Sequence, residues 1–175
     1  RQNKGKGFAV RNGALQARGE FILFTDADNS TDITEFDKCQ QELWGGYDIV
    51  IGSRALPESK IMIHQPWYRE VTGRLANKLI KILTGLPYQD TQCGFKCFSR
   101  KAALVIFKQA KIDRWAFDVE ALVLARKNGF KIKEMPINWR NDSSSKVSLG
   151  GYLKTLRELI KIRRIYKKEG ESSKR

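Results

Sequence analysis

The segment 21–28 reads Phe21-Ile22-Leu23-Phe24-Thr25-Asp26-Ala27-Asp28. Four hydrophobic residues followed by a threonine are typical of a buried strand, and this one ends in two carboxylates one residue apart. Burying a charged side chain costs free energy unless the charge has a partner, and open α/β sheets place their ligands beyond the carboxyl ends of their strands. The pattern therefore predicts a divalent cation held by Asp26 and Asp28. The alternative that the residues leave open is an Asp-rich turn without a ligand.

The length and composition favour one folded domain. A chain of 175 residues can bury a hydrophobic core, and a hydrophobic share of 41% argues against disorder. No stretch approaches the ~18 consecutive apolar residues of a transmembrane helix. The chain starts Arg1-Gln2-Asn3-Lys4-Gly5, without a methionine and inside what reads as a loop. We therefore expect a fragment whose first strands are missing.

The net charge of +14 predicts an anionic partner: nucleic acid, a membrane surface or a phosphorylated substrate. No helix-turn-helix or zinc pattern appears in the sequence, so nucleic acid is not the expected partner. Basic residues gather in residues 1–18 and 152–168, and in the second region they alternate with apolar residues. That alternation predicts a basic amphipathic helix. It either lies on a membrane surface or packs on the domain with its basic face in solvent.

The order of the predicted elements indicates an α/β fold with a mixed, mainly parallel sheet. The patterns predict helices over 8–18, 32–44 (capped by Thr31), 67–84, 101–109, 117–128 and about 150–168. Strands are predicted over 21–26, 47–52 and 93–98, with an edge strand over 131–139 that Pro136 interrupts. Residues 57–66 and 141–146 read as loops.

Several blocks of residues carry a resemblance to a known family. They are Asn3-Lys4-Gly5-Lys6-Gly7-Phe8-Ala9-Val10, the strand into Asp26-Ala27-Asp28, Asp90-Thr91-Gln92-Cys93-Gly94-Phe95-Lys96 and Arg114-Trp115-Ala116-Phe117-Asp118-Val119-Glu120. In this order they resemble family 2 glycosyltransferases with the GT-A (Rossmann-like) fold, and among these the dolichyl-phosphate β-glucosyltransferases and mannosyltransferases. The resemblance implies a partial GT-A catalytic domain over residues 1–149, followed by a basic amphipathic helix and tail over 150–175.

The resemblance also implies an activity. Members transfer a hexose, with inversion, from a nucleotide sugar to a polyisoprenyl (dolichyl) phosphate. Glucose from UDP-glucose is the favoured donor, and GDP-mannose or an N-acetylhexosaminyl donor stays open. The implied place of action is the cytoplasmic face of a membrane, the endoplasmic reticulum in a eukaryote or the plasma membrane in a prokaryote, with this chain attached peripherally.

By the same resemblance, Asp26 and Asp28 lie beside the pyrophosphate with Mg²⁺ or Mn²⁺, Asp28 being the more direct ligand. The expectation agrees with the preference of these hard cations for carboxylates and substrate phosphates. Lys6, between Gly5 and Gly7, is expected to approach the nucleotide phosphates, since glycine permits close backbone approach.

The acceptor phosphate needs positive charge more than a base, because a phosphate monoester is already largely a dianion at neutral pH. The resemblance implies that Arg54 and Arg69 contact this phosphate. The other residues expected near the substrates are Ser53, Asp90, Arg140 and Lys146. Asp118 and Glu120 stand near a helix start, where acids also simply favour the helix dipole.

Two other classes of protein remain as alternatives. A phosphatase of the haloacid dehalogenase type also has a strand ending in Asp-x-Asp, but it needs a later acidic cluster that the sequence does not show. A basic nucleic-acid-binding module fits the charge and leaves the motifs unexplained. A folded chain without activity is a third possibility.

Overall fold

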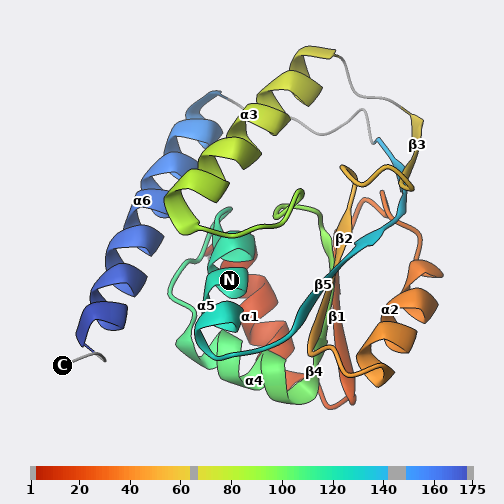
Figure 1. The fold of residues 1–175 in the computed structure, drawn as a ribbon, viewed down its shortest axis with the longest axis horizontal. Helices are drawn as coiled ribbons and strands as arrows, with labels where there is room; N and C mark the ends of the chain where they lie inside the picture. Colours follow the sequence, from red (N-terminus) through yellow and green to blue (C-terminus); the bar gives the residue numbers. More distant parts are fainter. Residues whose placement is uncertain (1–2, 64–66, 142–148, 173–175) are drawn as a thin grey trace.

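The computed structural model describes residues 3–63, 67–141 and 149–172 (Figure 1). Its helices are α1 (Lys6–Gln16), α2 (Glu35–Trp44), α3 (Trp67–Thr84), α4 (Arg100–Gln109), α5 (Phe117–Lys127) and α6 (Leu149–Ser172). Its strands are β1 (Phe21–Thr25), β2 (Ile49–Ser53), β3 (Lys60–Ile63), β4 (Phe95–Ser99), β5 (Ile132–Pro136) and β6 (Asn138–Arg140).

The main sheet has the strand order β1-β4-β2-β5. β4 is antiparallel to both β1 and β2, and β2 is parallel to β5, so β1, β2 and β5 share one direction. The prediction of a mixed α/β sheet in which most strands run the same way is confirmed. This direction places the ends of β1 and β2, and with them Asp26 and Arg54, at the same edge of the sheet.

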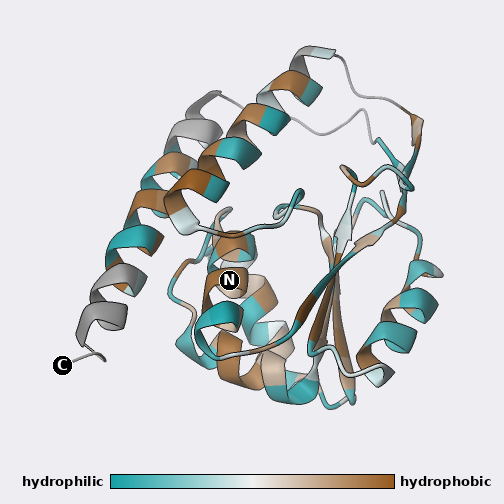
Figure 2. Cartoon of the chain, viewed as in Figure 1, coloured by the Kyte–Doolittle hydropathy of each residue, from teal (hydrophilic) through white to brown (hydrophobic). Residues whose placement is uncertain are grey.

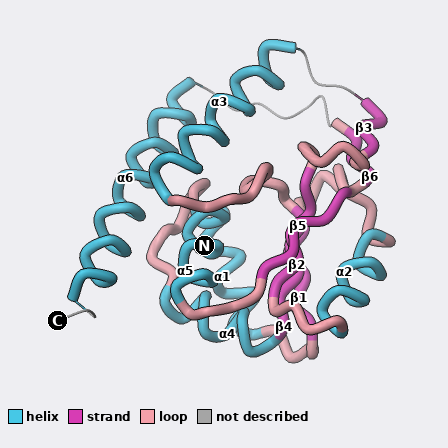
Figure 3. The backbone as a smooth tube through the Cα atoms, viewed as in Figure 1, coloured by secondary structure: helices cyan, strands magenta, loops and turns pink. Residues whose placement is uncertain are grey.

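Helices cover both faces of the sheet, with α1, α4 and α5 on one side and α2 on the other (Figure 3). β2 is buried along its whole length, and its alternate residues serve two separate cores. Ile49 and Ile51 belong to the core under α1, α4, α5 and α6. Val50 belongs to the smaller core under α2. The hydrophobic run 47–52 was therefore correctly interpreted as a buried strand.

The structure corrects the prediction that residues 57–66 form a loop. Lys60–Ile63 is a strand, β3, which pairs in parallel with β6. The predicted edge strand 131–139 is two strands, β5 and β6, and the break falls after Pro136, which lacks an amide hydrogen for a ladder. β3 and β6 together form a small second sheet.

Thr31 was wrongly predicted to cap the helix over 32–44. The helix starts later, at Glu35, and Thr31 is buried and bridges to Trp139. The turn before the helix is instead held by Asp32, whose Oδ1 accepts a hydrogen bond from the Thr34 amide at 2.8 Å.

The last helix, α6, packs on the domain. Its residues Leu159, Ile162 and Tyr166 are buried in the core shared with α1, α4 and α5. Its exposed residues in the described part are mostly basic: Lys154, Arg157, Lys161, Arg163 and Arg164. Of the two alternatives for this helix, the structure favours a packed helix with a basic face in solvent. Among the described residues, no helix combines the length and apolar character needed to cross a membrane.

Candidate active site

The two carboxylates follow β1 in a tight turn. The Asp26 amide donates to the Gly94 carbonyl oxygen at 3.0 Å, which ties the turn to the residue before β4. The Asp28 carboxylate accepts from the Ser30 amide at 3.0 Å, and Asn29 has a positive φ of 53°. Asp28 is exposed and Asp26 is half-buried. Both carboxylates are thus held at the edge of the sheet, one facing solvent and one against the protein.

Gly94 makes room for the Asp26 carboxylate. A Cβ atom built on Gly94 would overlap the Asp26 side chain, so any larger residue there would displace the carboxylate. In the sequence, Gly94 stands in the motif Asp90–Lys96 with no sign of its role. Its function becomes visible only when residues 26 and 94 are seen in contact.

Lys6, the first residue of α1, forms an ion pair with Asp26. Its Nζ lies 2.6 Å from Asp26 Oδ1 and within 6 Å of the centroids of three aromatic rings, Phe24, Trp115 and Phe117. Asp26 Oδ1 is buried and has no hydrogen bond of good geometry within the described residues. The oxygen therefore has an ammonium beside it and retains a lone pair for a ligand.

Gly5 and Gly7 pack against the chain itself. Gly5 has a φ of 112°, and a Cβ on Gly7 would collide with Phe117 and the Ile112 carbonyl. The amides of Gly7 and Phe8 donate to the carbonyls of Arg114 and Asp113 at 3.2 and 3.0 Å. These glycines allow α1 to start close to the 112–117 segment, which brings Lys6 to Asp26. Their contact with nucleotide phosphates stays a prediction.

A second ion pair, fully buried, lies behind the first. Lys96 of β4 and Asp118 of α5 are 2.7 Å apart, with side-chain exposures of 1% and 6%, and Lys96 also donates to the Cys93 carbonyl. Burial raises the pKa of Asp118, while Lys96 and Lys6 oppose this rise and Asp26 adds to it. Since Asp118 responds to Lys6 and Asp26, the two ion pairs form one cluster of alternating charge.

The ion pair of Lys96 and Asp118 was not predicted from the sequence. The available signal was Lys96 itself, a charged residue in the middle of the hydrophobic run Phe95-Lys96-Cys97-Phe98.

For Glu120, a structural role agrees better with the structure than a role in substrate binding does. Its carboxylate is buried and accepts from the amides of Lys111 and Ile112 at 2.9 and 2.8 Å and from the Tyr166 hydroxyl at 2.7 Å.

Arg54 and Asp90 form a bidentate ion pair at the end of β2. The two side-chain contacts measure 2.6 and 2.9 Å, and the Arg54 amide donates to the same carboxylate at 3.1 Å. Burial works against both charges, but Asp90 raises the pKa of the guanidinium and Arg54 holds the pKa of Asp90 below the ordinary aspartate value. Trp139 covers the guanidinium, with 5.4 Å from Cζ to the ring centroid.

Neighbouring residues fix this pair in place. The Glu134 carboxylate accepts from the Gln89 and Asp90 amides, both at 2.8 Å through one oxygen. Ser53 is fully buried, and its hydroxyl accepts from the Ala55 amide at 3.3 Å, so it shapes the turn that carries Arg54. Asp90 and Ser53 thus position Arg54, and direct substrate contact by either stays a prediction.

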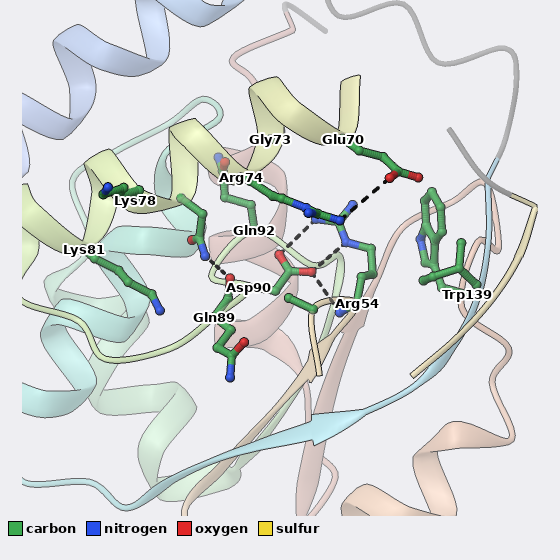
Figure 4. A pocket seen from close by; sticks show the side chains of 13 residues that line it. Arg54, Glu70, Gly73, Arg74, Lys78, Lys81, Gln89, Asp90, Gln92 and Trp139 are labelled. Carbon is green, nitrogen blue, oxygen red and sulfur yellow. Dashed lines mark hydrogen bonds and ion pairs between the residues drawn. The ribbon is translucent and has the colours of Figure 1, made fainter. Parts of the chain in front are cut away.

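A cavity of about 720 Å³ opens between α3 and the end of β2 (Figure 4). Arg54, Asp90 and Trp139 line one wall. One face of α3 lines the other, contributing Glu70, Gly73, Arg74, Asn77, Lys78 and Lys81. Four of the lining residues are basic (Arg54, Arg74, Lys78, Lys81) and two are acidic (Glu70, Asp90), and Arg54 is already paired with Asp90. The α3 wall therefore gives the cavity its positive charge.

The remaining predicted residues are placed as follows. Arg140 ends β6, and its amide donates to the Ser30 carbonyl at 2.8 Å, which brings it beside the Asp26–Asp28 turn. Arg69 lies in the first turn of α3, and its side chain is outside the described part. Lys146 lies outside the described residues. One edge of the sheet therefore carries Lys6, both carboxylates, Arg54 with Asp90, and Arg140.

The residues present fit a divalent cation that also binds substrate. Asp26 Oδ1 and the exposed Asp28 carboxylate are hard oxygen donors of the kind Mg²⁺ and Mn²⁺ accept. Within the described ranges, no group of three or more His, Cys, Asp or Glu residues is arranged to hold a metal. The turn after β1 supplies the carboxylates of Asp26 and Asp28, and the phosphates of a substrate would complete the coordination.

Substituting Gly94 by alanine should disturb Asp26 specifically. The added methyl group displaces the carboxylate, so we expect a loss of about 1–3 kcal/mol in the free energy of unfolding and weaker cation-dependent nucleotide binding. Gly13→Ala is the matched control, because nothing lies within 4 Å of a Cβ at that helical position. Urea denaturation and calorimetric titration with uridine diphosphate measure both effects. Equal behaviour of the two variants would contradict the role of Gly94.

The chain is similar in sequence to known proteins. The chain is 36% identical to the dolichyl-phosphate beta-glucosyltransferase ALG5D of Trichomonas vaginalis, over 94% of this chain and 52% of the relative. It is also 36% identical to the human dolichyl-phosphate beta-glucosyltransferase, over 94% of this chain and 53% of that protein. The resemblance to this group is confirmed, and the chain spans about half the length of these relatives.

Among solved structures, the fold is similar to glucosyl-3-phosphoglycerate synthase from Mycobacterium tuberculosis. The complex with uridine diphosphate gives a TM-score of 0.61 at 15% identity, over 91% of this chain and 55% of that one. The complex with Mn²⁺, UDP-glucose and phosphoglyceric acid gives 0.58. At this identity the likeness concerns the fold alone, and it confirms the predicted GT-A class.

The family model described as "Glycosyl transferase family 2" matches residues 1–107. This match covers the Lys6 helix, the Asp26–Asp28 turn, the Arg54–Asp90 pair and the basic face of α3. The chain belongs to glycosyltransferase family 2.

Proposed function

We propose that this chain is the part of a glycosyltransferase that transfers glucose from UDP-glucose to dolichyl or another polyisoprenyl phosphate, with inversion. The observation that carries the proposal is one edge of the sheet that holds two carboxylates after β1 and, at the end of β2, a cavity lined by basic residues. A reaction between two phosphate-bearing substrates needs both features. The names of the relatives add the choice of glucose and of a dolichyl acceptor.

On the donor side, Asp26 and Asp28 would hold Mg²⁺ or Mn²⁺, whose charge offsets the negative charge that develops on the departing nucleoside diphosphate. Lys6 lies 2.6 Å from Asp26 and would bind the same diphosphate. Gly5 and Gly7 let its helix start at this position.

On the acceptor side, the cavity beside α3 supplies positive charge for the lipid phosphate. Arg54 presents its guanidinium to the cavity while Asp90 fixes its orientation, and arginine suits phosphate because its planar fork donates two parallel hydrogen bonds. Arg69, Arg140 and Lys146 are proposed to add charge around the same phosphate. No general base is proposed, because the acceptor phosphate already carries the attacking charge.

The proposed place of action is the cytoplasmic face of a membrane, where a polyisoprenyl phosphate presents its phosphate to water. The endoplasmic reticulum would serve in a eukaryote and the plasma membrane in a prokaryote. GDP-mannose is the alternative donor. None of the described residues is assigned to the nucleotide base, so these residues do not select between uracil and guanine.

Labelled donors test the proposal directly. Purified protein is incubated with a short-chain polyprenyl phosphate, Mn²⁺ and either labelled UDP-glucose or labelled GDP-mannose, using this chain and a form extended to the length of the relatives. We expect label in the lipid fraction from UDP-glucose. Label from GDP-mannose would refute the choice of donor. If neither donor labels the lipid and Asp28→Ala changes nothing, the transferase proposal is wrong.

A further inference from the structure

Helix α3 carries a row of exposed apolar side chains on a helix face next to the one that lines the cavity. Its members are spaced four, four, four and three residues apart, which puts them on one side of the helix. Their exposed fractions are Trp67 76%, Val71 46%, Leu75 61%, Leu79 39% and Ile82 68%. We call this row the α3 stripe. Figure 2 shows the alternation of hydrophobic and hydrophilic segments along α3.

A continuous row of exposed large apolar side chains is unusual on a soluble surface and marks a contact with a partner. The sequence offered the last helix as one candidate for such a contact. In the structure, α6 buries Leu159, Ile162 and Tyr166 in the core, and Ile160 is the large apolar residue it exposes within its described part. The apolar face available for a partner therefore belongs to α3, and α6 contributes charge.

We propose that the α3 stripe rests on an anionic lipid bilayer, with α6 lying beside α3 as a second, purely electrostatic contact. The helices pack side by side (Figure 1). Both helices carry basic residues: Arg74, Lys78 and Lys81 are on the adjoining face of α3, and Lys154, Arg157 and Lys161 are exposed on α6. An apolar strip edged by lysine and arginine is the pattern of helices that lie in the membrane interface.

The charge distinguishes a bilayer from a second copy of this chain. Two copies joined stripe to stripe would bring the basic residues of two α3 helices together in a protein whose net charge is +14. An anionic leaflet neutralises the same residues. Charge complementarity therefore favours lipid as the occupant.

This arrangement deepens the proposed function and rests on it for one step. One face of α3 would touch the bilayer while the next face lines the basic cavity, so the cavity would lie close to the membrane surface. A lipid acceptor could then keep its hydrocarbon tail in the bilayer while its phosphate reaches Arg54. The docking surface itself needs no substrate, and it can be tested without one.

The experiment is flotation of the chain with lipid vesicles, in the absence of nucleotide and dolichyl phosphate. We expect binding to vesicles of phosphatidylcholine mixed with phosphatidylserine, and weaker binding to phosphatidylcholine alone. The double variant Leu75→Gln/Ile82→Gln should bind roughly tenfold more weakly or worse, because two apolar contacts are lost. The matched control is Ile33→Gln/Trp44→Gln, which changes two residues of 57% and 66% exposure on the α2 side of the sheet.

Circular dichroism and thermal melting check that both variants fold. As a second measurement, brominated lipid should quench the fluorescence component that Trp67→Phe removes, and leave the component that Trp44→Phe removes. Vesicle binding that is equal for the wild type and the stripe variant overturns the proposal. A wild-type dimer that the stripe variant dissociates also overturns it, since a second copy would then be the occupant. These results leave the sugar-transfer assay unaffected, so the two proposals fail separately.

Discussion

In the variant Lys96→Met, the free energy of unfolding should be about 3–5 kcal/mol lower than in the wild-type protein. Methionine fills the space of the lysine stem but removes the ammonium that pairs with Asp118 at 2.7 Å and donates to the Cys93 carbonyl. The Asp118 carboxylate is then left buried without its partner, and an unpaired buried charge is costlier than the original pair was favourable. Urea denaturation followed by circular dichroism measures the change.

A double-mutant cycle separates the pair from its surroundings. Asp118→Leu alone should be comparably destabilising, whereas the double variant Lys96→Met/Asp118→Leu should lose much less than the sum of the two single changes. Lys133→Met is the surface control. Its partner Glu42 is 4.0 Å away and both side chains are more than a third exposed, so we expect a change of roughly 0–1 kcal/mol. Additive effects at Lys96 and Asp118 would show that the buried pair is not coupled.

The elements that the sequence predicted correctly are those whose pattern is local. The strand at 47–52 is a continuous apolar run, and the helix predicted over 67–84 agrees with α3 at both ends. β3 was missed because Lys60-Ile61-Met62-Ile63 becomes a strand only by pairing with β6, more than seventy residues later in the chain. Thr31 was misread for the same reason, since its place is decided by Trp139.

In the candidate site, too, the residues in local motifs were predicted and the contacts between distant elements were not. Asp26, Asp28 and Arg54 stand in short motifs at strand ends, so sequence and resemblance together could select them. What the sequence did not reveal is which groups neutralise one another: Lys6 with Asp26, Arg54 with Asp90 and Lys96 with Asp118. Each pairing depends on how distant elements meet, and so does the space that Gly94 leaves for a carboxylate.

The second large effect is expected at Asp28. Asp28→Asn should weaken Mn²⁺-dependent binding of uridine diphosphate about a hundredfold or more, because one of the two carboxylates available to the cation is lost. Asp37→Asn is the control, since it removes an exposed carboxylate of α2 on the other face of the sheet. Calorimetric titration with and without Mn²⁺ gives both constants. It is run on this chain and on a form extended to the length of the relatives.

Lys6→Met shows whether the same two carboxylates are the cation site. The Lys6 ammonium lies 2.6 Å from Asp26, so a metal that binds Asp26 must compete with it. Removing the ammonium should strengthen the binding of Mn²⁺ alone, as measured by electron paramagnetic resonance of the free ion. It should at the same time weaken the binding of the Mn²⁺–diphosphate complex, because that ligand loses a protein cation. If Lys6→Met leaves Mn²⁺ binding unchanged and Asp28→Asn does the same, the cation binds elsewhere. The carboxylates after β1 would then be the simple turn that the sequence left open.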